Sequence, residues 1–164
     1  MRSAVPIGYF GLLRTNINSL RILVAEDDHK DIFLLRCAFT QAGVTVPLHF
    51  VHDGEQAIDY LEGNDSFSDR NTHPFPTLVL LDNKMPRLSG LDVLKWLRQQ
   101  PRLRRLPVLI FSSSSLLRDI NLAADLGANA YLVKPNTLEE LRGLVRAITE
   151  FWCDHHWCAD CHPN

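Results

Sequence analysis

The chain has 164 residues, a length that fits one domain, and its 46% hydrophobic and 22% charged residues match a folded protein with a substantial apolar core. Its 17 basic and 19 acidic side chains leave a formal net charge of −2, so no broad positive field is available to hold a nucleic-acid backbone or an anionic membrane surface. Because no apolar run reaches the roughly 18 residues of a membrane-spanning helix, we expect neither nucleic acid nor a membrane among the partners.

The cysteines predict the surroundings of the protein and set apart its last segment. Cys37 lies alone in an apolar helical pattern, whereas the other three cysteines lie close to the end of the chain. This distribution is unlike a disulfide framework and favours a reducing, cytoplasmic location. We expect residues 1–20 to form a loosely ordered N-terminal extension, and residues 151–164 to form a tail rich in cysteine and histidine.

From Arg21 onward, short apolar runs that are typical of buried strands alternate with stretches of helical spacing. The first four predicted elements are a strand at 22–25, a helix with apolar positions from Ile32 to Ala42, a strand at 48–51 and a helix at 55–61. Gly43 is a typical residue to stop the first of these helices. Residues 63–76 are polar and hold two prolines, so we expect a surface loop that is long for a connection in such a fold.

The second half of the chain continues the alternation. Three more strands are predicted, at residues 78–81, 108–111 and 130–133. The helices that follow them are predicted to open at Ser89 and stop before Pro101, to span 116–126 before Gly127, and to run from Thr137 to Ile148. Ser89 with Asp92, and Thr137 with Glu140, have the spacing of capping boxes. Five strands, each followed by a helix, predict an α/β fold: a (βα)5 doubly wound sandwich around a central five-stranded parallel sheet.

Polar and charged side chains stand where the predicted strands end. They are Glu26, Asp27, Asp82, Ser112 and Lys134. Because open α/β sheets bind ligands outside the carboxyl ends of their strands, we expect these side chains to converge at one edge. A divalent cation relieves the repulsion between crowded carboxylates, and oxygen ligands of this kind suit Mg²⁺. With Lys134 as a second positive charge, the edge is predicted to receive a phosphoryl group.

Within this predicted site, Asp82 is the natural acceptor, since a carboxylate is an established covalent nucleophile in phosphoryl transfer. Mg²⁺ and Lys134 would offset the charge on the transferring oxygens. The Ser112 hydroxyl is able to donate one hydrogen bond to a phosphoryl oxygen. Asp82, Lys134 and Ser112 are thereby predicted to have different roles in the same phosphoryl transfer.

Four sequence blocks resemble the receiver domain of two-component response regulators when taken together and in order. They are ILVAEDD at 22–28, LLDNKMPRLSG at 80–90, PVLIFS at 107–112 and GANAYLVKP at 127–135. The resemblance covers residues 21–150 and implies a phosphoacceptor signalling protein rather than an enzyme. The roles it implies are a metal-binding acidic pair at Glu26 and Asp27, the phosphoacceptor at Asp82, a metal-binding backbone carbonyl at Lys84, a switch hydroxyl at Ser112, a switch aromatic at Tyr131 and the invariant-type lysine of the family at Lys134.

The resemblance also implies partners. A sensor histidine kinase would donate the phosphoryl group and contact the start of the first helix, around residues 29–32, and the loop at Pro135. The single-domain build and the long 63–76 loop are most similar to the small regulators that partner bacterial and cyanobacterial phytochromes. The resemblance further implies a homodimer through the helix at 116–126, the strand at 130–133 and the last helix. Possible contacts on that face are Leu116, Leu117, Tyr131, Leu138 and Phe151.

Other interpretations stay open at this point. A receiver-shaped module that binds a partner without phosphorylation fits the same sequence. A phosphatase with an aspartyl nucleophile is less consistent, because such enzymes normally show an Asp-x-Asp pair and this chain has Lys84 at the third position. In the tail, the spacing of Cys153, Cys158, Cys161 and His162 would suit zinc. The alternative is a simple tail in which Phe151 and Trp152 pack on the body of the domain.

Overall fold

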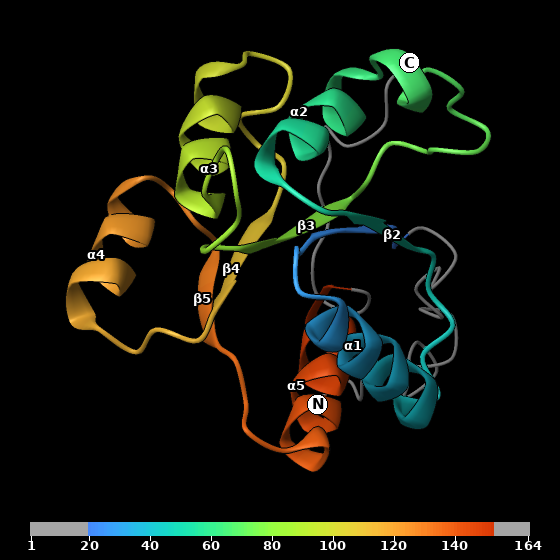
Figure 1. Ribbon diagram of the computed structural model, residues 1–164, viewed down its shortest axis with the longest axis vertical. Coiled ribbons are helices and arrows are strands. Elements are labelled where there is room, and N and C mark those ends of the chain that lie inside the picture. The colour runs from blue at the N-terminus through green and yellow to red at the C-terminus, as the bar shows by residue number, and fades with distance from the viewer. Residues whose placement is uncertain (1–19, 153–164) are drawn as a thin grey trace, which may run out of the picture.

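The computed structural model describes residues 20–152, and within this range five parallel strands form one sheet in the order β2-β1-β3-β4-β5 (Figure 1). The strands are β1 (Ile22–Ala25), β2 (Leu48–Val51), β3 (Leu78–Asp82), β4 (Val108–Ser112) and β5 (Ala130–Val133). The α-helices are α1 (His29–Ala42), α2 (Gly54–Glu62), α3 (Gly90–Gln99), α4 (Leu117–Asp125) and α5 (Leu138–Glu150). A helix follows each strand, which confirms the predicted (βα)5 doubly wound fold.

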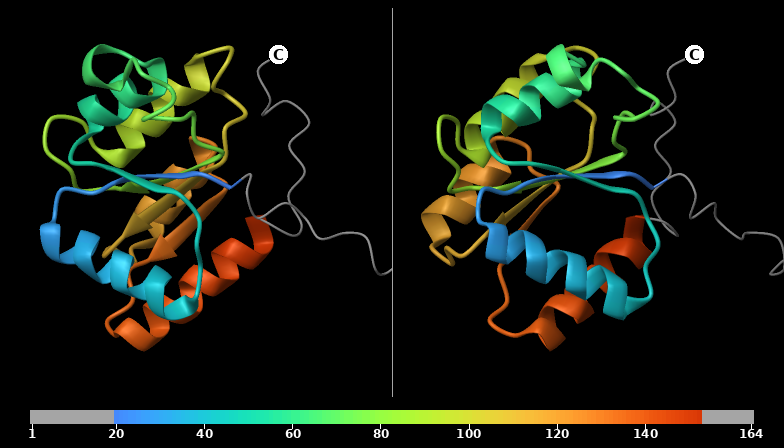
Figure 2. Two further views of the ribbon diagram at one scale, coloured as in Figure 1. Left: turned by 90° about the vertical axis from the view of Figure 1, so that its right-hand side faces the viewer. Right: turned by 45° about the vertical axis from the view of Figure 1, so that its right-hand side comes forward.

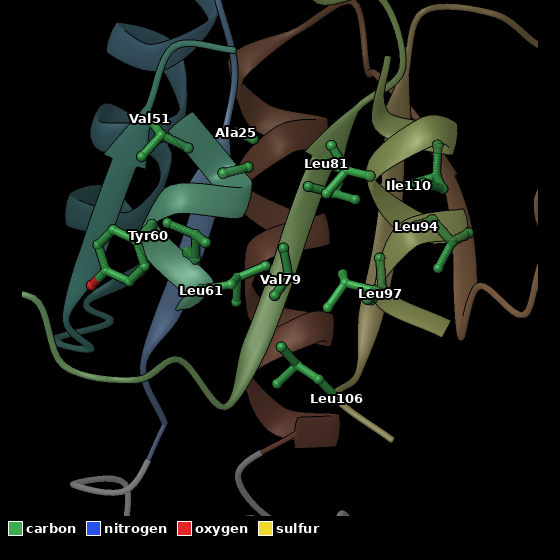
Figure 3. Packing of buried hydrophobic residues seen from close by; sticks show 14 of the residues in the cluster. Ala25, Val51, Tyr60, Leu61, Val79, Leu81, Leu94, Leu97, Leu106 and Ile110 are labelled. Carbon is green, nitrogen blue, oxygen red and sulfur yellow. The ribbon is translucent and has the colours of Figure 1, made fainter. Parts of the chain in front are cut away.

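Two apolar layers hold the sheet between its helices. Figure 2 shows α1 and α5 on one side of the sheet, with α2 and α3 on the other. Alternate residues of one strand face opposite layers: Ile22 and Val24 pack with α1 and α5, whereas Leu23 and Ala25 pack with α2 and α3. Figure 3 shows the second layer, where Val79 and Leu81 of β3 meet Leu61, Leu94 and Leu97. Burial on both faces is the reason why the central strands are continuous apolar runs.

The helix ends follow the predicted signals, although only one of the two predicted capping boxes is complete. The box between Ser89 and Asp92 has both of its hydrogen bonds, whereas at Thr137 one half forms: the hydroxyl accepts a hydrogen bond from the Glu140 N–H at 3.2 Å. Helix α1 begins at His29, ahead of the apolar pattern, because the Asp28 carboxylate accepts from the Lys30 N–H at 2.7 Å and caps the helix. Among residues 20–152, none of the helices is both long enough and apolar enough to cross a membrane.

The predicted surface loop at 63–76 is fastened to the domain at several points. It contains a short 3₁₀ turn, η2 (Asp65–Phe67). The Arg70 guanidinium donates to the carbonyl oxygens of Tyr60 at 2.7 Å and Leu61 at 2.9 Å, so it binds the end of α2. The Tyr60 hydroxyl in turn donates to the Pro74 carbonyl at 3.0 Å. Although the loop is long, these hydrogen bonds therefore hold it against the domain.

We expect the histidine beside this loop to make the fold sensitive to acid. Burial, with the nearby charges of His73 and Arg21, lowers the pKa of His49 below its ordinary value of 6.5. Below pH 6.5, His49 binds a proton in the unfolded chain but stays neutral in the folded one. The free energy of unfolding therefore decreases as the pH falls. Urea denaturation at about pH 7.5 and about pH 5.5 should show a smaller acid loss for His49→Gln than for the parent.

The same substitution at His52, whose ring pairs with His29 instead, serves as the control. His52→Gln should keep the acid loss of the parent. An unchanged acid loss in His49→Gln would contradict the explanation.

Candidate metal and phosphoryl site

Three carboxylates converge at the carboxyl edge of the sheet, as predicted. Ala25 of β1 pairs with Leu81 of β3, so the residues that follow, Glu26 and Asp82, lie side by side. Carboxylate oxygens of Glu26, Asp27 and Asp82 lie within 4.8 Å of one another. Glu26 is 1% exposed and Asp82 is 5% exposed, whereas Asp27 faces solvent. Two sheltered oxygen ligands and an open one fit a hard divalent cation that keeps some of its water.

The turn after β3 folds back over Asp82. The backbone N–H of Lys84 donates to the Asp82 carboxylate at 3.2 Å, so this residue stands at the site, and the metal-binding role of its carbonyl stays a prediction. Arg87 fastens the turn to the start of α2 by ion pairs with Asp53 and, at 3.1 Å, with Glu55. This anchor was not predicted from the sequence, since an arginine after a proline gives no sign of its distant partners.

Lys134 lies among the carboxylates, within reach of the predicted acceptor. Its backbone N–H donates to the Ser112 carbonyl at 2.8 Å, which joins the end of β5 to the end of β4. Its ammonium lies 2.7 Å from Glu26 Oε2, 2.7 Å from Asp31 Oδ2 and 3.3 Å from Asp82 Oδ1. Asp31 was missed in the sequence. A usable signal was its place in the first turn of a helix that starts at this same edge.

The site holds more negative than positive charge. Burial raises the pKa of Glu26 to about 7, although Lys134 opposes the shift by hydrogen bonding and by its charge. Burial likewise raises the pKa of Asp82 against the effect of Lys134. Burial alone would lower the pKa of Lys134, but hydrogen bonds to Asp31 and Glu26 raise it instead. The ammonium is therefore held charged, and one lysine does not fully compensate its carboxylates, which favours a bound cation.

The predicted switch residues are both tied to the connection between β4 and α4. Ser112 is fully buried at the end of β4, and its hydroxyl oxygen accepts from the Ser114 N–H at 3.2 Å. The Tyr131 hydroxyl donates to the Ser114 carbonyl at 2.9 Å, with the ring packed against the core. Ser114 itself donates from its side chain to Asp119 in α4 at 2.6 Å. Ser114, one of four consecutive serines, was not singled out in the sequence, yet it links Ser112, Tyr131 and α4.

Several apolar side chains in or next to α4, β5 and α5 are exposed. The large ones are Leu116, Leu117, Leu122, Val133 and Phe151. Leu138 is partly buried instead and packs with the α1 and α5 layer. The prediction that Phe151 and Trp152 both pack on the body is right for Trp152 and wrong for Phe151, which is 52% exposed and contacts the Trp152 ring.

Two predictions fall outside the described residues. The zinc ligands proposed in the tail, Cys153, Cys158, Cys161 and His162, all lie beyond residue 152. The predicted N-terminal extension, residues 1–20, also lies outside the described residues, apart from Leu20, which is buried.

Comparisons with known proteins agree with this geometry. The response regulator receiver domain family matches residues 22–146. The crystal structure of response regulator RPA3017 in red light signalling of R. palustris is 40% identical, with a TM-score of 0.81, and the match covers 84% of this chain and 96% of that one. The phosphorylated cyanobacterial phytochrome response regulator RcpA is 32% identical, with a TM-score of 0.76 and the same coverage.

A third relative provides a structure with a metal. Response regulator Rcp1 of Synechocystis sp. is 30% identical over 133 residues, which cover 81% of this chain and 88% of Rcp1. The crystal structure of its Mn²⁺-bound form superposes with a TM-score of 0.73 at 29% identity, and the match covers 84% of this chain and 97% of that one.

Proposed function

The chain belongs to the family of response regulator receiver domains, which are signalling proteins of two-component systems, and we propose that Asp82 accepts a phosphoryl group from a sensor histidine kinase with the help of Mg²⁺. One observation carries the proposal. The cluster of Glu26, Asp27 and Asp82 lies at the carboxyl edge of the sheet, and the Lys134 ammonium lies 3.3 Å from Asp82 Oδ1. A nucleophilic carboxylate, a set of cation ligands and a fixed positive charge thus lie within one site.

The transfer is a displacement at phosphorus. An Asp82 carboxylate oxygen forms the new O–P bond while the N–P bond to the kinase histidine breaks, and the imidazole leaves with the electron pair of that bond. Mg²⁺ held by Glu26, Asp27, Asp82 and the Lys84 carbonyl would offset the charge of the transferring oxygens. Lys134 donates a hydrogen bond to one of these oxygens and Ser112 donates to another.

The proposed switch uses the links through Ser114. When the Ser112 hydroxyl turns toward the phosphoryl group, it gives up the hydrogen bond from the Ser114 N–H. Ser114 also holds Tyr131 and, through Asp119, the first turn of α4, so its movement changes the face formed by α4, β5 and α5. The exposed side chains of that face, with Leu117 74% exposed, are where we place the homodimer contact.

The relatives suggest what lies upstream. Because RPA3017 is described in red light signalling and RcpA as a phytochrome response regulator, we propose a phytochrome as the kinase of this chain. Its contact would lie at the start of α1 and the Pro135 loop, next to Asp82. We further propose that the receiver spans residues 21–150, with an extension and a tail at its ends, and works in the cytoplasm.

Acetyl phosphate tests the function directly. Incubation of the full chain with this donor should add one phosphoryl group by intact mass when Mg²⁺ is present, and none when the metal is removed with EDTA. The metal dependence follows from the uncompensated carboxylates of the site. If no group is added under conditions that modify a known receiver, the chain instead acts as a binding module independent of phosphorylation.

A further inference from the structure

Lys134 is held by more than the groups that the proposed transfer uses. Its two shortest contacts are to Glu26 and Asp31, both at 2.7 Å, and Asp82 is the more distant partner at 3.3 Å. An ammonium has three N–H donors, and Lys134 gives one hydrogen bond to Glu26 and one to Asp31, whereas Asp82 is its ion-pair partner. The contact with Asp31 therefore takes one donor of the lysine without serving the acceptor.

Asp31 differs from the other two carboxylates in its place. Glu26 and Asp82 belong to the group of three whose oxygens would hold a cation, and Asp31 is not a member of that group. It stands in the first turn of α1, a helix whose start is fixed by the Asp28 cap. Its side chain is one third exposed, at 33%, yet it reaches a lysine 103 positions away in the sequence. Asp31 is therefore an ion-pair partner of Lys134 that a bound metal would not use as a ligand.

Two cations would otherwise compete for the same oxygens. A divalent ion bound by Glu26 and Asp82 attracts the carboxylates that Lys134 now contacts, and it repels the ammonium. With Asp31 present, the lysine keeps a full hydrogen bond when Glu26 turns to the metal. With Asp31 absent, the only carboxylates left to the ammonium are those that the metal needs. Each cation would then weaken the binding of the other.

We propose that Asp31 is a positioning residue, which holds the Lys134 ammonium beside Asp82 and so allows lysine and metal to occupy the site together. The importance of this residue for phosphoryl transfer rests on the proposed function above, whereas its effect on metal binding does not. Asp31 is not one of the three carboxylates that would hold the metal, one of which is the acceptor, and it acts through Lys134 alone.

Metal affinity of the unphosphorylated full chain, measured by calorimetric titration with Mn²⁺, tests the proposal. Asp31→Asn should weaken binding by about tenfold, the usual scale for partners outside the ligand set. The matched control is Asp28→Asn, which removes the same charge from the same end of α1. Asparagine caps a helix as well as aspartate, and the Lys134 contacts are left intact, so binding should change by less than about twofold.

A second pair of variants separates positioning from simple loss of charge. In a Lys134→Ala background no ammonium competes with the metal, so adding Asp31→Asn should change the Mn²⁺ affinity by less than about twofold. Circular dichroism and urea denaturation of each variant confirm that it is folded. Equal affinities for Asp31→Asn and the parent, or a tenfold loss that persists without Lys134, would overturn the proposal.

Phosphoryl uptake of the parent, measured in parallel, distinguishes the two proposals. If the parent takes up no phosphoryl group while Asp31→Asn still weakens Mn²⁺ binding, the proposed function is contradicted and the role of Asp31 is supported. If the parent is phosphorylated normally while Asp31→Asn binds Mn²⁺ as well as the parent, the proposed function is supported and the role of Asp31 is contradicted.

Discussion

Asp82→Asn is expected to abolish phosphoryl uptake from acetyl phosphate completely while the chain stays folded. The amide has the shape of the carboxylate but cannot serve as the nucleophile. Burial raises the pKa of Asp82, which means that the site disfavours its charge, and a neutral asparagine lowers the repulsion from Glu26. We therefore expect a free energy of unfolding in urea that equals or exceeds that of the parent near neutral pH. Intact mass gives the uptake.

The control for this variant is the same substitution at an exposed position outside the site. Asp125 lies at the end of α4 and faces solvent, so Asp125→Asn should take up one phosphoryl group as the parent does. A phosphoryl group on Asp82→Asn would place the acceptor elsewhere in the chain, and peptide mapping of that product would locate it.

Gly90→Ala is expected to damage fold and site together. A Cβ atom at residue 90 would lie 2.3 Å from the Asp82 carbonyl oxygen and 3.0 Å from the carbonyl carbon. Both atoms belong to the backbone of β3, which cannot yield without shifting the acceptor. We expect a loss of about 1–3 kcal/mol in the free energy of unfolding, as for other overpacked sites, and a weaker Mn²⁺ affinity. Urea denaturation and metal titration give the two values.

Gly143→Ala provides the opposite case with the same chemical change. Gly143 lies inside α5 with nothing within 4 Å of a Cβ atom, so the substitution should stabilise the fold by about 0.5–1 kcal/mol. The two variants should therefore differ in sign. Equal stabilities for Gly90→Ala and the parent would show that the turn after β3 is free to move away, and that the close approach of Gly90 does not hold Asp82 in place.

The fold and the centre of the site were predictable because their signals are local. Each central strand is a continuous apolar run that ends in a polar residue, as Leu81 is followed by Asp82, so one stretch of sequence reports both burial and the edge of the sheet. A parallel sheet then brings those ends together without further information. The start of α1, expected around residues 29–32, lies at His29, because the Asp28 side chain caps the helix there.

The contacts that complete the site were not predictable, because each depends on how distant segments are placed. Asp31 resembles any acidic residue in a first helical turn until β5 brings Lys134 to it. Ser114 resembles its serine neighbours until Tyr131 donates to its carbonyl. Arg87 gives no sign of Asp53 and Glu55, with which it forms ion pairs beside the turn after β3. Sequence patterns report burial and period, whereas such pairings follow only from the assembled layers.

The sheet order β2-β1-β3-β4-β5 has a consequence for how the protein becomes active. Glu26 directly follows the first strand to be synthesised, and Lys134 directly follows the last, 108 positions later. Early folding of β1, α1 and β2 would give a partial sheet without the lysine that compensates the buried glutamate. Contacts at such separations form late, since the chain loses much freedom in closing so long a loop. A nascent or truncated chain without Lys134 would thus be unable to accept the phosphoryl group. Phosphorylation would begin only when the whole domain has folded.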